Sequence, residues 1–150
     1  MGASRKAAEV LHIGRYTLHG EIASGGMASV HFGKLTGKGG FERAVAIKRL
    51  HPHLVKDPEF RAVILDEARL AARVRHPNVV QPLDVIDSDG EVLLVMEYVH
   101  GESLSRLIRK ARDRGEPVPL PICATIMSNV LHGLHSAHEA KDDRGNPLGI

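Results

Sequence analysis

The chain has 150 residues, 43% of them hydrophobic, and carries 20 Lys and Arg against 18 Asp and Glu, a net charge of +2. A domain of this length buries about 68–70% of its unfolded surface, so a folded core is expected. The near balance of charge argues against a nucleic-acid or membrane-surface protein. The single cysteine, Cys123, cannot form an internal disulfide, and we find neither a secretory signal nor an apolar run that could span a membrane. A cytoplasmic protein is expected.

The first two thirds of the chain alternate apolar and polar residues with a period of two, which is typical of strands. Bounded by glycine, proline and aspartate, this pattern predicts five strands, over 16–23, 28–35, 42–50, 79–86 and 91–96. A helix is predicted between the third and fourth strands, because Asp57 can cap it and Pro58 suits its first position. It should end by Arg75, before the next proline. The connections favour an antiparallel sheet.

The last third changes to a helical pattern. Helices are predicted over 103–113 and 120–140, separated by a segment rich in glycine and proline. The expected fold class is therefore α+β, with a small antiparallel sheet that carries one helix, followed by the start of a helical region.

The turn between the first two strands is a candidate anion site. It reads Ala23-Ser24-Gly25-Gly26-Met27-Ala28, and small residues allow backbone N–H groups to approach a phosphate closely. The alternative is an ordinary glycine hairpin.

The third strand offers a second candidate group. Alternation places Ala46 and Lys48 on one face, where the lysine could reach a phosphate while the small alanine leaves room for a flat ring. The alternative is a solvated lysine near the end of a strand.

The predicted helix carries a carboxylate within an apolar stripe. The stripe is formed by Val63, Glu67, Leu70, Ala71 and Val74. If this face meets the sheet, a buried Glu67 needs a cation, and Lys48 is the best-placed one. The alternative is a Glu67 at the rim of the helix, paired with Arg73 or with nothing.

Four ordered motifs carry a resemblance to a known family. They are the glycine turn Ala23–Val30, the strand Val45-Ala46-Ile47-Lys48, the phrase His76-Pro77-Asn78-Val79-Val80 and the segment Val95-Met96-Glu97-Tyr98-Val99. In this order and spacing the sequence resembles the N-terminal part of a bacterial (eukaryotic-like) serine/threonine protein kinase. The turn departs from the family's G-x-G-x-x-G-x-V pattern at Ala23 and Ala28, from which we expect weaker closure over phosphates but not loss of the site.

The resemblance implies an organisation and a site. Residues 1–15 would be an N-terminal extension, 16–97 a kinase N-lobe with a five-stranded antiparallel sheet and one αC-type helix, 98–101 the hinge, and 102–150 the incomplete start of the helical C-lobe. Lys48 would contact the α- and β-phosphates of ATP and pair with Glu67, the two catalytic residues carried by this chain. The residues implied to contact ATP are Ile22, Ala23, Ser24, Gly25, Gly26, Met27, Ala28, Val30, Ala46, Lys48, Met96, Glu97, Val99 and Glu102.

The 150 residues contain neither an H-R-D nor a D-F-G segment. By the resemblance, the protein ligands of Mg²⁺ would lie beyond Ile150, and no metal site is expected here. The function implied is transfer of phosphate from ATP to Ser or Thr hydroxyls of a protein by a longer chain, with this chain alone inactive. The alternative is a non-catalytic nucleotide-binding or protein-interaction module. An apolar surface is expected to be exposed on the last helix, formed by Ile126, Met127, Val130, Leu131 and Leu134.

Overall fold

The structure is a computed structural model that describes residues 10–88 and 90–150. The chain forms two compact units, which are treated separately. The first unit contains the residues up to Ala72 together with Gln81–Tyr98, and the second contains Arg73–Val80 and Val99–Ile150.

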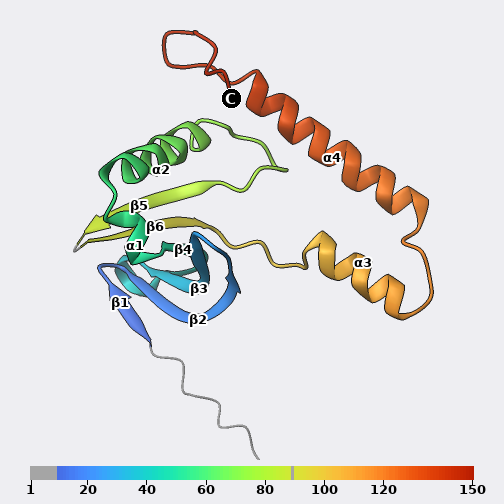
Figure 1. The fold of residues 1–150 in the computed structure, drawn as a ribbon, viewed down its shortest axis with the longest axis horizontal. Coiled ribbons are helices and arrows are strands. Elements are labelled where there is room, and N and C mark those ends of the chain that lie inside the picture. Colours follow the sequence, from blue (N-terminus) through green and yellow to red (C-terminus); the bar gives the residue numbers. More distant parts are fainter. Residues whose placement is uncertain (1–9, 89) are drawn as a thin grey trace, which may run out of the picture. The chain divides into compact units, whose positions relative to one another are not determined.

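The first unit is built on one antiparallel sheet (Figure 1). Its six strands within the described residues are β1 (Leu11–Ile13), β2 (Tyr16–Ser24), β3 (Ala28–Thr36), β4 (Glu42–Leu50), β5 (Pro82–Ser88) and β6 (Glu91–Glu97). They follow the order β1-β2-β3-β4-β6-β5, and every neighbouring pair is antiparallel. The α+β class and the antiparallel sheet are confirmed. All five predicted strands are present, and β1 adds a sixth.

Short helical segments connect these strands. The first unit holds the 3₁₀ turn Lys38–Gly40, α1 (Pro52–Val55) and α2 (Pro58–Ala71). The predicted start of α2 is confirmed, because Asp57 Oδ1 accepts hydrogen bonds from the backbone N–H groups of Glu59 at 3.0 Å and Phe60 at 3.4 Å. α2 ends at Ala71, four residues earlier than predicted.

α1 and α2 contribute to one of two apolar cores. Buried Ala28, Leu50, Val55 and Val92 form this core, against which Phe60, Ile64 and Leu65 of α2 pack. The predicted stripe on α2 is wrong at two positions, since Val63 and Leu70 remain 54% and 37% exposed. Each has an apolar neighbour one residue further on, Ile64 and Ala71, about 100° around the helix. The sequence pattern alone does not distinguish the two faces.

The second core lies on the other face of the sheet and is formed by Tyr16, Leu18, Val45, Ile47, Leu93 and Val95. At its edge, the Tyr16 hydroxyl donates a hydrogen bond of 2.7 Å to Asp84 Oδ2, and Arg15 Nη2 donates another of 2.9 Å. Tyr16 lies on β2 and Asp84 on β5, which are not neighbours in the sheet. The sheet is therefore curled enough for these two strands to meet through side chains.

Burial of Asp84 by itself would raise its pKa. The hydrogen bonds from Tyr16, Arg15 and the backbone N–H of Val85 outweigh this effect and hold the pKa of Asp84 below its ordinary value. Burial, followed by the hydrogen bond to Asp84, raises the pKa of Tyr16. Asp84 is thus an ionised acceptor at neutral pH.

The second unit contains α3 (Leu104–Asp113) and α4 (Leu120–His138), close to the predicted ranges. Ser103 caps α3 by accepting a hydrogen bond from the Arg106 backbone N–H at 3.3 Å. The segment Arg73–Val80 packs on α4, because Asn78 Nδ2 donates to the Asn129 carbonyl oxygen at 3.0 Å. A Cβ placed on Gly133 of α4 would lie 3.2 Å from the Asn78 carbonyl oxygen, so this glycine permits the close approach.

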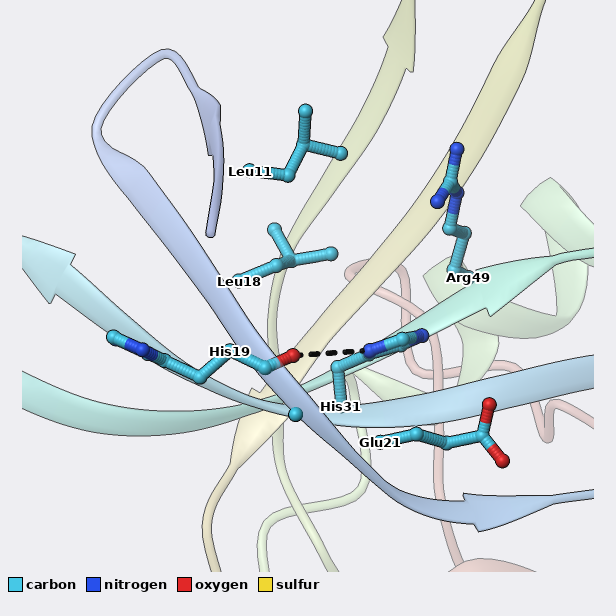
Figure 2. Close-up of a pocket in the computed structure, with 7 residues that line it drawn as sticks. Leu11, Leu18, His19, Glu21, His31 and Arg49 are labelled. Carbon is cyan, nitrogen blue, oxygen red and sulfur yellow. Dashed lines mark hydrogen bonds between the residues drawn. The ribbon is translucent and has the colours of Figure 1, made fainter. Parts of the chain in front are cut away.

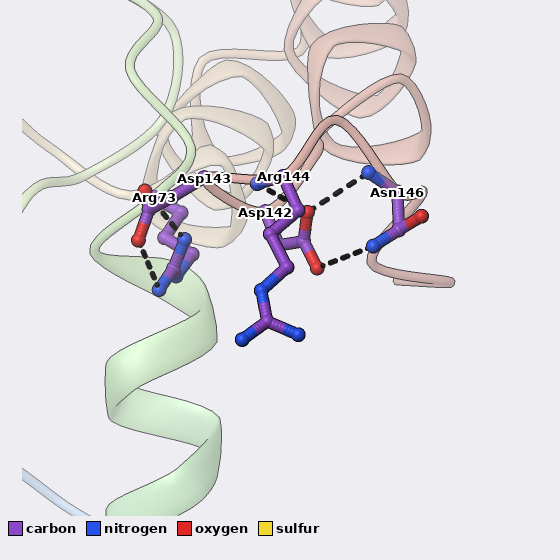
Figure 3. Close-up of polar contacts among 5 residues, drawn as sticks. All are labelled: Arg73, Asp142, Asp143, Arg144 and Asn146. Atoms are coloured by element: carbon purple, nitrogen blue, oxygen red, sulfur yellow. Dashed lines mark hydrogen bonds and ion pairs between the residues drawn. The ribbon is translucent and has the colours of Figure 1, made fainter.

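The loop after α4 is held by two aspartates (Figure 3). Asp142 Oδ1 accepts from the backbone N–H groups of Arg144 and Asn146, and Oδ2 accepts from the Asn146 side-chain amide at 3.0 Å. The hydrogen bonds from Asn146, first from its side chain, lower the pKa of Asp142. Asp143 pairs with both terminal nitrogens of Arg73, at 3.1 and 3.3 Å.

The expected apolar surface on α4 is largely confirmed. Met127, Val130, Leu131 and Leu134 are each about half exposed, whereas Ile126 is half-buried. In the described part of the chain, none of the helices has both the length and the apolar character needed to cross a membrane.

Candidate functional site

Three neighbouring strands bring the predicted site residues of the sheet together. Two rows of directly paired residues cross β3, β4 and β6, namely Val30–Lys48–Leu94 and Phe32–Ala46–Met96. Directly paired residues of antiparallel strands lie on the same face, and alternate residues of one strand also share a face. Val30, Ala46, Lys48 and Met96 are therefore neighbours on one face of the sheet.

Lys48 and Glu67 line one cavity of about 150 Å³ on this face. The rest of its lining is apolar and comes from Leu50, Ile64, Ala68, Ala71, Val92 and Leu94. Lys48 is half-buried, but Glu67 is exposed, so the expectation that Glu67 is buried is wrong. Within the described residues, no ion pair joins the two side chains in this structure. An exposed carboxylate keeps its hydration and does not need a cation for stability.

The glycine turn leaves two backbone donors unused. β2 ends at Ser24, and the Gly25 N–H donates to the Ala28 carbonyl oxygen at 2.9 Å. In the described part of the chain, no hydrogen bond is formed by the N–H of Gly26 or of Met27. Neither Gly25 nor Gly26 has a positive φ, and a Cβ on Gly26 would meet nothing within 4 Å. The glycines keep the turn open, and they are not required by a left-handed backbone.

The two alanines that depart from the family pattern lie in strands. Ala23 pairs with Val30 across β2 and β3, and Ala28 pairs with Leu50 across β3 and β4. Ala28 is only 6% exposed and belongs to the core beneath α1 and α2. Its methyl group therefore packs inside the protein, away from solvent.

The remaining predicted residues of the first unit differ in exposure. Ile22 and Met27 are more than half exposed, Ala46 is 9% exposed, and Met96 is half-buried. The Glu97 N–H donates to the Gln81 carbonyl oxygen at 3.0 Å, so only its carbonyl group could serve a ligand.

Val99 and Glu102 belong to the second unit. The Val99 side chain is 62% exposed. Glu102 accepts from Arg106 Nε at 3.1 Å, an exposed pair one helical turn apart. Their expected contacts with ATP remain predictions.

One residue at this site was missed by sequence reasoning. His51 Nε2 donates a hydrogen bond of 2.9 Å to the Gly25 carbonyl oxygen, at the tip of the turn. His51 directly follows β4, at the end of the strand that the sequence predicts over 42–50. Two histidines beside a proline carry no spacing signal that points to a turn 26 residues earlier.

A larger cavity, of about 420 Å³, lies on the opposite face of the sheet (Figure 2). His31 and Arg49, which line it, alternate along their strands with Val30 and Lys48. His31 Nδ1 donates to the His19 carbonyl oxygen at 3.2 Å, beside the irregular register between Leu18 and Glu21. This histidine supports the bulged strand and faces away from Lys48.

No group of three or more His, Cys, Asp or Glu side chains that could hold a metal ion occurs among residues 10–88 and 90–150.

The comparisons with known proteins identify a family. A family profile described as "Protein kinase domain" matches residues 16–141. The chain is 42% identical over 137 residues to the tyrosine-protein kinase MasK of Myxococcus xanthus, covering 91% of this chain and 21% of that protein. It is 34% identical over 142 residues to the serine/threonine-protein kinase PksC of Streptomyces coelicolor, covering 92% of this chain and 25% of that protein.

A solved kinase structure is also similar to this chain. The PknI kinase domain of Mycobacterium tuberculosis superimposes with a TM-score of 0.69 at 25% identity, covering 92% of this chain and 53% of that one. The chain thus spans about a fifth to a quarter of these curated relatives and about half of the PknI kinase domain. The bacterial kinase relatives, the matched profile and the kinase fold together show that this chain belongs to the protein kinase family.

Proposed function

We propose that this chain binds ATP on the face of the sheet that carries Lys48. The observation that carries the proposal is the pair of cross-strand rows that place Val30, Ala46, Lys48 and Met96 side by side. A cation next to a small residue, with apolar side chains around them, suits a flat base joined to a chain of phosphates.

The donors at this site fit a triphosphate. Lys48 supplies a positive charge, and the N–H groups of Gly26 and Met27 have no acceptor among the described residues. Charged hydrogen bonds to phosphate oxygens are among the stronger polar contacts in proteins. Glu67 lines the same cavity as Lys48, and pairing of the two would fix the ammonium toward the phosphates.

Catalysis is proposed for a longer chain. Mg²⁺ bound to ATP would neutralise the charge that develops during phosphoryl transfer. The role of the residues described here is to bind and orient ATP and to hold the Lys48 ammonium.

We propose a serine or threonine hydroxyl of a protein as the acceptor. The names of PksC and of PknE from Mycobacterium bovis, 31% identical over 140 residues, support this choice, whereas the name of MasK points to tyrosine. Phosphoamino-acid analysis of substrates labelled by a longer chain that includes these residues would decide between them.

The ATP proposal is tested by titrating the chain with a fluorescent ATP analogue. Lys48→Met should weaken binding about tenfold or more, the loss expected for one charged hydrogen bond to phosphate. Lys34→Met is the matched control, because Lys34 also lies in the sheet but its ammonium pairs with Glu42 at 3.0 Å. Equal affinity of wild type and Lys48→Met would contradict the proposal.

The second candidate is a non-catalytic nucleotide-binding or protein-interaction module. We expect phosphorylation of a generic protein substrate by the 150-residue chain to stay at background. Turnover that is lost in Lys48→Ala would show instead that this chain is itself a competent enzyme.

A further inference from the structure

His51 makes two hydrogen bonds to the glycine turn. Its Nε2–H donates to the Gly25 carbonyl oxygen at 2.9 Å, and its backbone N–H donates to the Met27 carbonyl oxygen at 3.0 Å. His51 therefore binds the carbonyl groups of Gly25 and of Met27, the residues before and after Gly26.

The first of these bonds fixes a peptide plane. The Gly25–Gly26 peptide is trans, so its C=O and N–H point in opposite directions. Because the Gly25 carbonyl points at the His51 ring, the Gly26 N–H must point away from His51. That N–H is one of the two donors in the turn with no acceptor among the described residues.

His51 is itself firmly held. It follows Leu50, which is 3% exposed, and its carbonyl oxygen accepts from the N–H groups of Leu54 at 3.0 Å and Val55 at 3.4 Å in α1. Val55 is buried in the core beneath α2. The His51 ring stacks on that of His53, with centroids 5.8 Å apart and planes inclined by 17°. The turn is thus attached to a rigid point.

Apart from the bonds to His51, the tip is ordered by the hydrogen bond of 2.9 Å from the Gly25 N–H to the Ala28 carbonyl oxygen, which does not involve the Gly25–Gly26 peptide. Gly25 and Gly26 lack a side chain, and Met27 is 54% exposed. A glycine-rich turn without an anchor samples many backbone conformations, and each would aim the free N–H differently.

We propose that His51 is a positioning residue, which orients the Gly26 N–H for a phosphate group by holding the Gly25 carbonyl. The inference rests on the proposed function for its ligand, ATP. We expect its effect at the phosphate end of that ligand, since the hydrogen bonds donated by the His51 ring and by its backbone N–H both go to the glycine turn.

The experiment compares ATP with adenosine, each titrated calorimetrically into the wild type and three variants. His51→Phe keeps the ring but removes the donor, and His51→Gln restores an N–H donor of similar reach. His53→Phe is the matched control, because the His53 ring has a stacking contact but no side-chain hydrogen bond to any residue that the structure describes. Amide order parameters of residues 25–27 in the free protein report on the turn directly.

His51→Phe removes the hydrogen bond to the Gly25 carbonyl that orients the Gly26 N–H. We therefore expect it to bind ATP about three- to tenfold more weakly than the wild type. Adenosine affinity should not change, His51→Gln should recover most of the loss, and His53→Phe should resemble wild type. Order parameters of the turn should fall below about 0.6 in His51→Phe and recover in His51→Gln. Unchanged ATP binding, or an equal loss for adenosine, would overturn the inference.

The two proposals fail in different ways. If wild type binds neither ATP nor adenosine, the proposed function fails. The order parameters still test His51 in that case, and a turn that is equally rigid in wild type and His51→Phe would refute its role.

Discussion

Two glycines of the first unit, one in the glycine turn and one in β3, differ in the space around them. A Cβ on Gly26 would meet nothing within 4 Å, whereas a Cβ on Gly33 would lie 2.5 Å from Ile47 Cδ1 and 3.2 Å from the Thr17 carbonyl oxygen. Gly26 is thus free of packing constraints, and Gly33 is required by the core.

Gly26→Ala should fold normally and bind ATP more weakly. Its backbone has no positive φ, so alanine fits, and a slight gain in stability of about 0.4–1 kcal/mol is expected from the stiffer unfolded chain. The added methyl group lies beside the free N–H and hinders a phosphate. Chemical denaturation and ATP titration measure the two effects, and a loss of stability without a change in affinity would contradict the assignment.

Gly33→Ala should have the opposite profile. Overpacking against Ile47 predicts a loss of about 1–3 kcal/mol in the free energy of unfolding. Gly33 pairs with Val45, and both lie on the face opposite Lys48, so the ATP affinity of the folded fraction should be kept. Denaturant titration with the Gly26→Ala protein as control provides the test.

The site could be predicted from the sequence where it depended on strand alternation. Ala46 and Lys48 share a face because they are two residues apart in one strand, whatever the rest of the fold does. The burial of Glu67 could not be predicted, because it depends on how α2 is rotated about its axis. Val63 and Ile64 are both apolar and lie about 100° apart around the helix axis, so either could face the core. The sequence does not decide between these two rotations of α2.

At the scale of elements, the long strands and helices were predictable and the short ones were not. β1 has three residues, too few to show a period of two, and α1 has four residues. The hydrogen bond between Tyr16 and Asp84 could not be predicted either. It joins β2 and β5, which are not neighbours in the sheet, so it depends on how strongly the sheet curls.

Tyr16→Phe should therefore loosen the curled sheet. Removing the hydroxyl leaves Asp84 with one donor fewer and predicts a loss of about 0.5–1.5 kcal/mol in the free energy of unfolding. The pKa of Asp84 is lowered in the folded protein, so its stabilising effect is present above the unfolded pKa of about 3.9 and is lost as the pH falls through the folded value. Urea denaturation at pH 7 and pH 3 should show a smaller difference between wild type and variant at pH 3. An equal difference at both pH values would contradict this role of Asp84.

The loop after α4 is a second element whose order depends on one carboxylate. Asp142→Ala removes the acceptor of three hydrogen bonds, and the amide protons of Arg144 and Asn146 should exchange faster with solvent. Asp143→Ala, which breaks only the pair with Arg73, is the matched control.

The pH dependence of this loop has a definite sign. The pKa of Asp142 is lowered by the folded loop, so the loop is stabilised above the unfolded pKa of about 3.9 and loses this contribution as the pH falls through the lower folded value. The amide shifts of Arg144 and Asn146 should stay constant from pH 7 to about pH 4 and change only below it. A transition near neutral pH would show that another group controls the loop.

At the scale of the whole molecule, the order of the sequence motifs was the strongest predictor of the protein family. Each motif alone is ambiguous, but the glycine turn, the V-A-I-K strand and the later segments follow one another at the spacing of a kinase. The profile match over residues 16–141 confirms the family.

The helical unit exposes much apolar surface. Leu104 and Ile108 of α3 and Met127, Val130 and Leu131 of α4 are each between 45% and 58% exposed. Apolar patches of this kind drive association unless something covers them.

The 150-residue chain should therefore self-associate at micromolar concentration and bind the dye ANS, as measured by light scattering and fluorescence. The double variant Met127→Glu, Leu131→Glu should reduce both signals, because charges on α4 oppose burial of that face. A wild-type chain that stays monodisperse, does not increase ANS fluorescence and melts in one cooperative step would show that these side chains do not drive association.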